Sequence, residues 1–129
     1  MGKIDQYGLV CLSSVGDYMN DRIKKHEYTR PAKEEDRIQH MYTIGAHPGP
    51  VFLAHRHIPK LNDLKKSWCA SNKPGFSFTS EDEVLHEGWK IEDRTVIDSI
   101  TSLFSQDVEQ TYIADGHHRS AASAKVGLR

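Results

Sequence analysis

Short apolar runs alternate along the chain with longer amphipathic stretches. The short runs are rich in apolar, β-branched or aromatic residues, which is typical of strands, and they cover residues 7–13, 50–54, 76–79, 84–91 and 111–114. The longer stretches place apolar side chains three and four positions apart, which predicts helices over residues 31–44, 59–70 and 93–104. One or two helical turns are expected within residues 15–23, and an Ala-rich helix from Ser120 onward. The alternation predicts a mixed α/β fold, with α+β as the alternative, and argues against a helix bundle or a sandwich.

The stretch 31–44 carries the strongest helix signals. Thr29 is expected to cap this helix, Pro31 suits its first turn, and Gly45 is expected to end it. Three apolar side chains share one face by their spacing and are expected to be buried: Ile38, Met41 and Tyr42.

Length and charge limit the classes of partner. A chain of 129 residues suits a single compact domain. With 17 Lys and Arg against 18 Asp and Glu, its formal charge is −1, so neither DNA nor an anionic membrane is the expected partner. No run approaches the roughly 18–20 apolar residues of a membrane span, and the first residues do not resemble a signal peptide. We therefore expect a cytoplasmic protein, whose oligomeric state the sequence leaves open.

The sharpest local motif is the sequence Asp115-Gly116-His117-His118-Arg119, which follows a predicted strand and precedes a predicted helix. The glycine lets the backbone approach a ligand closely, and the amide groups at the start of a helix favour anions. Arg119 could hold a phosphate with two hydrogen bonds, while Asp115 could orient a histidine or reach Mg²⁺ through water. The alternative is an ordinary turn with surface histidines. Neighbouring histidines rarely direct both rings at one ion, so no structural metal is expected.

A second candidate precedes the helix at 31–44, where His26 and Glu27 are followed by Arg30. Glu27 could accept a proton from a hydroxyl group, with His26 beside it. The alternative is a solvated, charge-rich entry into a helix. The other histidines, at positions 40, 47, 55, 57 and 86, are interpreted as surface or packing residues, with 55 and 57 a weak candidate site.

Together the two motifs resemble a known family. Residues 23–30 with Asp36-Arg37, followed by residues 112–119, resemble the bacterial family catalogued as domain of unknown function 1015. The closing segment of the second motif is also similar to the ParB/sulfiredoxin superfamily, in which a turn before a helix holds nucleotide phosphates. The resemblance implies a ParB/sulfiredoxin-like mixed sheet with flanking helices. The superfamily member with the most similar turn is the free serine kinase, which phosphorylates L-serine with ADP or ATP.

The resemblance also implies roles for individual residues. Gly116, His117, His118 and Arg119 become candidates for nucleotide phosphates, to which we add Arg30, and Asp115 becomes a candidate for Mg²⁺. Glu27, His26 and Asp115 are the candidate catalytic residues, although the role of Glu27 as a base is extrapolated and not carried by a matched motif. Sulfiredoxins carry a reactive Cys where this chain has His117, so reduction of sulfinic acids is not expected. Members of the family are longer, so the 129 residues are expected to be a segment of a larger protein.

The motifs together with the resemblance imply a domain that binds ADP or ATP with Mg²⁺ and transfers a phosphoryl group to a small hydroxylated molecule such as serine. Two alternatives stay open. One is a nucleotide-gated regulatory or binding module without turnover, and the other is a ParB-like relative in DNA partition. DNA is an unlikely partner because no basic surface or helix-turn-helix segment is visible.

Overall fold

The computed structural model describes residues 3–128, which form five helices and five strands. The chain divides into two compact units, and each is described by itself. The sheet unit consists of Cys11–Arg56 and Val108–Arg129, and the hairpin unit consists of Met1–Val10 and His57–Asp107. No helix within residues 3–128 combines the length and the apolar character needed to cross a membrane.

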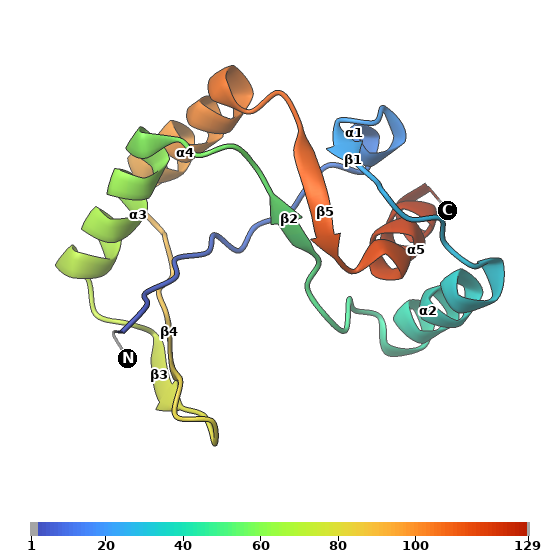
Figure 1. The fold of residues 1–129 in the computed structure, drawn as a ribbon, viewed down its shortest axis with the longest axis horizontal. Coiled ribbons are helices and arrows are strands. Elements are labelled where there is room, and N and C mark those ends of the chain that lie inside the picture. Colours follow the sequence, from blue (N-terminus) through green and yellow to red (C-terminus); the bar gives the residue numbers. More distant parts are fainter. Residues whose placement is uncertain (1–2, 129) are drawn as a thin grey trace. The chain divides into compact units, whose positions relative to one another are not determined.

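The sheet unit is built around a three-stranded mixed sheet (Figure 1). Its strands are β1 (Ile23–Lys24), β2 (Phe52–Ala54) and β5 (Thr111–Asp115). The central strand is β5, which pairs parallel with β1 and antiparallel with β2. The helices of this unit are α1 (Val15–Met19), α2 (Pro31–Ile44) and α5 (His117–Leu128). The prediction of a mixed α/β fold is therefore confirmed.

Packing of α2 against α5 forms the centre of the sheet unit. Ile38 and Met41 of α2 are buried against Ala122 of α5, with Val126 packed beside them. Ala121 and Ala124 are buried as well, and such small side chains let helices approach closely. The short helix α1 lies against the end of α5, where a Cβ added at Gly127 would come within 2.9 Å of Val15.

A buried carboxylate joins the two packed helices. Glu34 of α2 accepts hydrogen bonds from the Lys125 ammonium group of α5 and from the Thr29 hydroxyl group. Burial opposes the ionisation of Glu34, but these hydrogen bonds and the charge of Lys125 outweigh it, so the pKa of Glu34 lies below its usual value. The expected capping role of Thr29 is wrong, because the N-cap position of α2 is occupied by Arg30, whose side chain makes no capping bond.

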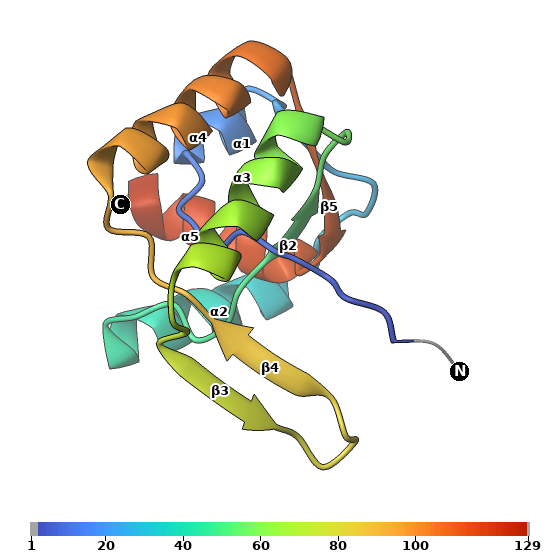
Figure 2. The same cartoon turned by 90° about the vertical axis from the view of Figure 1, so that its left-hand side faces the viewer.

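The hairpin unit contains α3 (Pro59–Ser71), β3 (Phe76–Thr79), β4 (Leu85–Gly88) and α4 (Arg94–Asp107). Strands β3 and β4 form an antiparallel hairpin (Figure 2). Two tryptophans fasten the segments next to it: Trp68 Nε1 donates to the carbonyl of Lys90 at 3.2 Å, and Trp89 Nε1 donates to the carbonyl of Asn72 at 3.0 Å. The strand predicted at 84–91 is confirmed in a shorter form, as β4.

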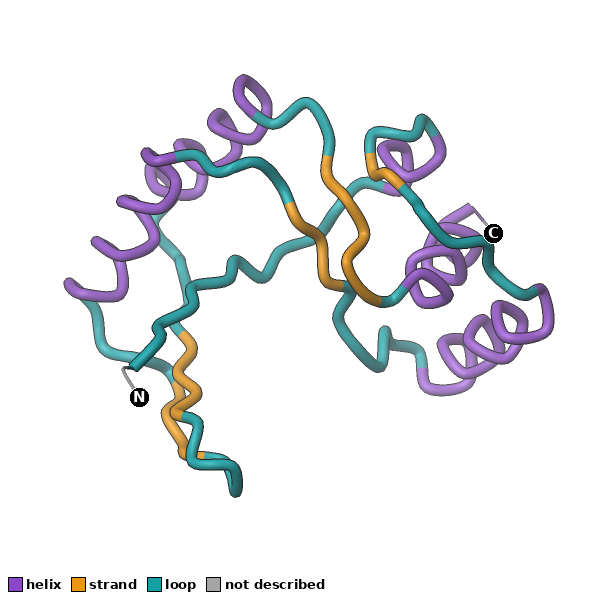
Figure 3. Tube along the Cα trace, viewed as in Figure 1, coloured by secondary structure: helices purple, strands orange, loops and turns teal. Residues whose placement is uncertain are grey.

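Several sequence predictions are wrong in detail. Residues 7–13 form a loop and not a strand (Figure 3), and Val10 and Leu12 are almost fully exposed. An apolar run forms a strand only where it pairs with another strand, and residues 7–13 pair with none of the strands in the described part of the chain. Tyr42 is half exposed, because only Ile38 and Met41 face α5. The last helix begins at His117, three residues before the expected start.

Candidate functional site

The turn between β5 and α5 creates the framework of the site. Gly116 has a φ of 90°, a left-handed conformation that favours glycine over other residues. The first backbone hydrogen bond of the helix runs from the Ser120 amide to the Gly116 carbonyl at 2.8 Å. The amides of residues 117–119 precede this bond, and such first-turn amides are free of intrahelical acceptors. The turn therefore places the positive end of a helix directly after the strand.

Arg119 lies between two glycines. A Cβ added at Gly49 would come within 2.8 Å of Arg119 Nη1, and one added at Gly116 would come within 3.3 Å of Nε and Nη2. Arg119 Nη2 also lies 3.5 Å from Asp115 Oδ2. Its side chain is two-thirds buried, with 32% exposed, whereas Asp115 is 79% exposed. Because neither glycine carries a side chain, the guanidinium group can occupy the space between them.

A cavity of about 600 Å³ opens beside this turn. Its lining comes from three places in the sequence: the loop after β1, the helix α2 with the loop that follows it, and the β5–α5 turn. The lining residues are Glu27, Arg37, His40, Pro48, Gly49, Ala114, Asp115, Gly116, His117, His118 and Arg119. All of them belong to the sheet unit, and the set carries two arginines, three histidines and two carboxylates.

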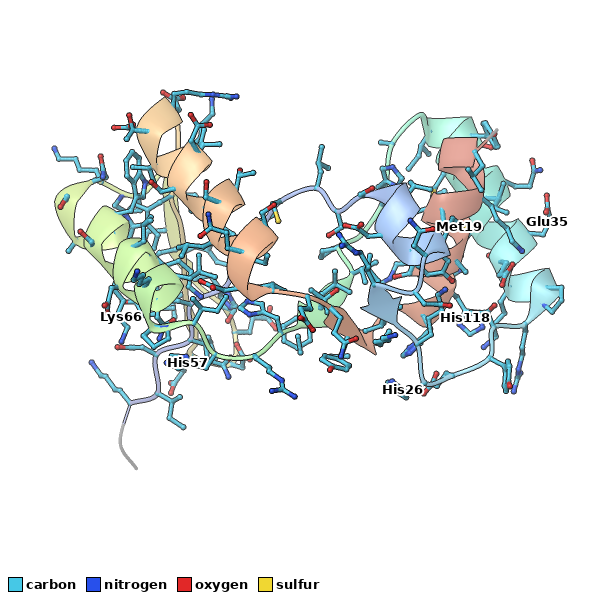
Figure 4. All side chains as sticks on the ribbon, turned by 90° about the horizontal axis from the view of Figure 1, so that it is seen from above. Met19, His26, Glu35, His57, Lys66 and His118 are labelled. Carbon is cyan, nitrogen blue, oxygen red and sulfur yellow. The ribbon has the colours of Figure 1, made fainter. Side chains whose placement is uncertain are left out.

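Three titratable side chains gather next to each other at His117. The Glu27 carboxylate lies 3.8 Å from His117 Nδ1 and 3.9 Å from His26 Nε2. The rings of His26 and His117 meet edge to face, with centroids 4.4 Å apart. Figure 4 shows His26 in the loop that follows β1. This cluster joins that loop to the first residue of α5.

The two neighbouring histidines of the turn have different surroundings. His117 is buried, and no hydrogen-bond partner of its Nε2 atom is found within residues 3–128. His118 Nε2 accepts a hydrogen bond from the Arg30 amide at 3.2 Å and so ties the entry of α2 to α5. His118 therefore holds the start of α2 against α5. The Nε2 atom of His117, by contrast, is buried without a hydrogen bond that would compensate the loss of water.

The structure brings most of the predicted site residues together. Glu27 and all five residues of the 115–119 motif line the cavity, and His26 contacts two of them. Arg30 is exposed and is not among the lining residues, and it contacts His118 through its backbone amide. The predicted ligand roles of all these residues stay predictions.

Five lining residues were not among the predicted site residues: Arg37, His40, Pro48, Gly49 and Ala114. Arg37 and His40 lie three positions apart on α2 and so share one face, a pattern that was available in the sequence. Gly49 carried no such signal, because its role depends on where the Arg119 side chain runs.

Fold and site define a mixed α/β protein in which a strand, a glycine and a helix N-terminus surround a polar cavity. The chain belongs to the family described as Protein of unknown function (DUF1015), whose family model matches residues 1–129, so the predicted family is confirmed. No curated protein and no solved structure gave a significant match.

Proposed function

We propose that the sheet unit binds the phosphates of ADP or ATP and transfers a phosphoryl group to a small hydroxylated molecule such as serine. The observation that carries this proposal is the position of Arg119 between Gly49 and Gly116 at the start of α5. The guanidinium group and the first amides of the helix belong to the same turn, and both favour an anion.

The charges around the cavity suit a polyphosphate. Arg37 from α2 and Arg119 from α5 both line it, and arginine binds phosphate through two parallel hydrogen bonds. His40 and His118 add hydrogen-bonding groups to the same lining. A volume of about 600 Å³ lies within the range of small-molecule sites. A ParB/sulfiredoxin-like mode of phosphate binding is part of this proposal.

Asp115 is the residue proposed to hold Mg²⁺. It ends β5, its carboxylate is exposed, and it lies next to the Arg119 guanidinium group. Mg²⁺ prefers oxygen ligands, keeps several waters, and is usually held by one or two carboxylates together with substrate phosphates. A carboxylate beside the phosphate-binding arginine meets this requirement.

Glu27 is the proposed acceptor of the proton from the substrate hydroxyl group. Its carboxylate lines the same cavity as Arg119 and contacts both His26 and His117. Phosphoryl transfer depends mainly on positioning and on stabilising charge, so a single suitably placed carboxylate is sufficient on the acceptor side.

Nucleotide titration of the protein and of Arg119→Ala tests the binding step. Loss of a charge-assisted hydrogen bond costs about 1.5–3 kcal/mol, so we expect the affinity for Mg-ADP to fall about ten- to a hundredfold. Arg56→Ala is the matched control, because Arg56 is an exposed arginine of the same unit outside the cavity lining. Unchanged affinity in Arg119→Ala would overturn the site assignment.

Incubation with serine, Mg²⁺ and ADP or ATP tests the transfer step. We expect O-phosphoserine, detected by mass spectrometry. Tight nucleotide binding without product over hours would favour a binding module without turnover. A salt-dependent shift of duplex DNA, with no nucleotide turnover, would favour the DNA-partition alternative.

A further inference from the structure

We propose that His26, Glu27 and His117 bind a divalent transition-metal ion of the Zn²⁺ class. Each side chain offers one ligand atom, and the three atoms lie within 4.8 Å of one another. Two imidazoles and one carboxylate are a common ligand set for such ions and leave at least one coordination position open. Mg²⁺ is a poor match to this set because it prefers oxygen ligands.

Binding an ion requires the three ligand atoms to move closer together. Ligand atoms about 2.1 Å from a tetrahedral ion lie about 3.4 Å apart. One ligand atom from each side chain lies within 4.8 Å of the other two, and the two carboxylate oxygens face different histidines: Glu27 Oε2 is 3.8 Å from His117 Nδ1 and Glu27 Oε1 is 3.9 Å from His26 Nε2. The side chains of His26 and Glu27 are 63% and 61% exposed, so both have room to adjust. His117 is the fixed member, because it is buried at the first position of α5.

Direct hydrogen bonds do not account for the cluster. Separations of 3.8 and 3.9 Å exceed those of hydrogen bonds between nitrogen and oxygen. The side chain of His117 is only 6% exposed, and its Nε2 atom has no hydrogen-bond partner within the described part of the chain. Burial of an imidazole with so little compensation is unfavourable. A metal ion at Nδ1 gives the buried ring a strong interaction through its other nitrogen, which compensates part of this cost.

The metal site goes beyond the proposed phosphate site. Arg119 carries the phosphate site, whereas the metal site depends on His26, which is not among the cavity-lining residues. Glu27 and His117 do line the cavity, so the open position of the ion is accessible to an oxygen ligand there. An oxygen bound to such an ion loses its proton more readily, which gives a second way to activate a hydroxyl group.

Calorimetric titration with Zn²⁺, in the absence of nucleotide, tests the proposal on the chelator-treated 129-residue chain. We expect saturable binding of one ion, weakened about tenfold or more in His26→Ala and in Glu27→Gln. Both substitutions are at exposed positions, and buried His117 is left unchanged so that folding is preserved. His47→Ala and Glu109→Gln are the matched controls, because both residues are exposed, belong to the sheet unit and lie outside the cluster.

Co²⁺ provides a second readout that depends on the ligands and not on activity. We expect visible absorption bands of a low-coordinate Co²⁺ site in the wild-type protein, with loss or change of these bands in His26→Ala. The proposal is overturned if the wild-type protein fails to bind either ion, or if the cluster variants and the controls bind Zn²⁺ equally. Because no nucleotide is present, these results are independent of the fate of the phosphate-site proposal.

Discussion

The two units of the chain differ in how they use their apolar residues. The sheet unit contains Ile23, Ile38, Met41, Ile113 and three alanines of α5 among its buried residues, whereas the buried apolar residues of the hairpin unit are Ile58 and Leu61. Within residues 3–128, the cavity that gathers arginines, histidines and carboxylates lies in the sheet unit. A polar site thus accompanies the better-buried framework, which is what accurate positioning of side chains requires.

The helices show that an amphipathic pattern and burial are separate properties. The apolar side of α4 is more sharply defined than that of α2 or α5, yet α4 has no buried residue. The helix α5 has a weak pattern, but four of its residues are buried, and three of these are alanines whose small side chains let it pack closely. The stability of a helix in this chain is therefore expected to follow its contacts and not its periodicity.

The largest expected effect is at the centre of the three-stranded sheet. Ile113→Ala removes a side chain that is 1% exposed, and such core truncations cost about 2–5 kcal/mol in free energy of unfolding. The half-buried Ile100 of α4 provides the comparison, for which Ile100→Ala is expected to cost about 1 kcal/mol. Urea unfolding measures both values, and hydrogen exchange shows which amides lose protection. Equal losses of unfolding free energy in the two variants would contradict the contrast between the units. Leu12→Ala, at an exposed loop position, is the control.

An intermediate effect is expected for the ion pair between the buried Glu34 of α2 and the half-exposed Lys125 of α5. Glu34→Gln removes hydrogen bonds to a charged group and is expected to lower the free energy of unfolding by about 1–3 kcal/mol at pH 7. Since the pKa of Glu34 is lowered by folding, its contribution is present above the unfolded pKa of about 4.3 and is lost as the pH falls through the lower folded value. Unfolding curves at several pH values measure this dependence. A difference between the two proteins that stayed constant down to pH 3 would contradict it.

The smallest effect is expected in the hairpin. Phe78 is 54% exposed and stacks on His86 of the paired strand, with ring centroids 5.0 Å apart. Phe78→Ala is therefore expected to cost about 0.2–1 kcal/mol, the range of one cross-strand pair. Thermal unfolding followed by circular dichroism measures the change. A loss comparable to that of Ile113→Ala would show that the hairpin contributes a core of its own.

Much of the fold was predictable from local signals. The helices over 31–44 and 59–70 were predicted almost to their ends, since Pro31 and Pro59 mark the starts and Gly45 adopts the left-handed conformation that ends α2. Strand β1 was missed because two residues, one of them Lys24, carry no periodic pattern. The loop at 7–13 was taken for a strand because apolar character alone does not reveal whether a partner strand is available.

The candidate site was predictable where its residues are neighbours in the sequence. The Asp115–Arg119 motif was recognisable because a turn and a helix start are local features. The contact between Glu27 and His117 could not be recognised in the sequence, because 90 positions separate the two residues. Only the parallel pairing of β1 with β5 brings them together. The role of Gly49 could not be predicted for the same reason, since it depends on the Arg119 side chain, which is distant in the sequence.

The central position of β5 has a consequence for biosynthesis. Both β1 and β2 pair with β5, which is the last strand of the described chain to be made. While the ribosome adds residues 57–107, β1 and β2 have no partner strand, and α5, against which α1 and α2 pack, has not been made. The nascent chain therefore passes through a stage in which unpaired strand edges are accessible to chaperones or to other chains.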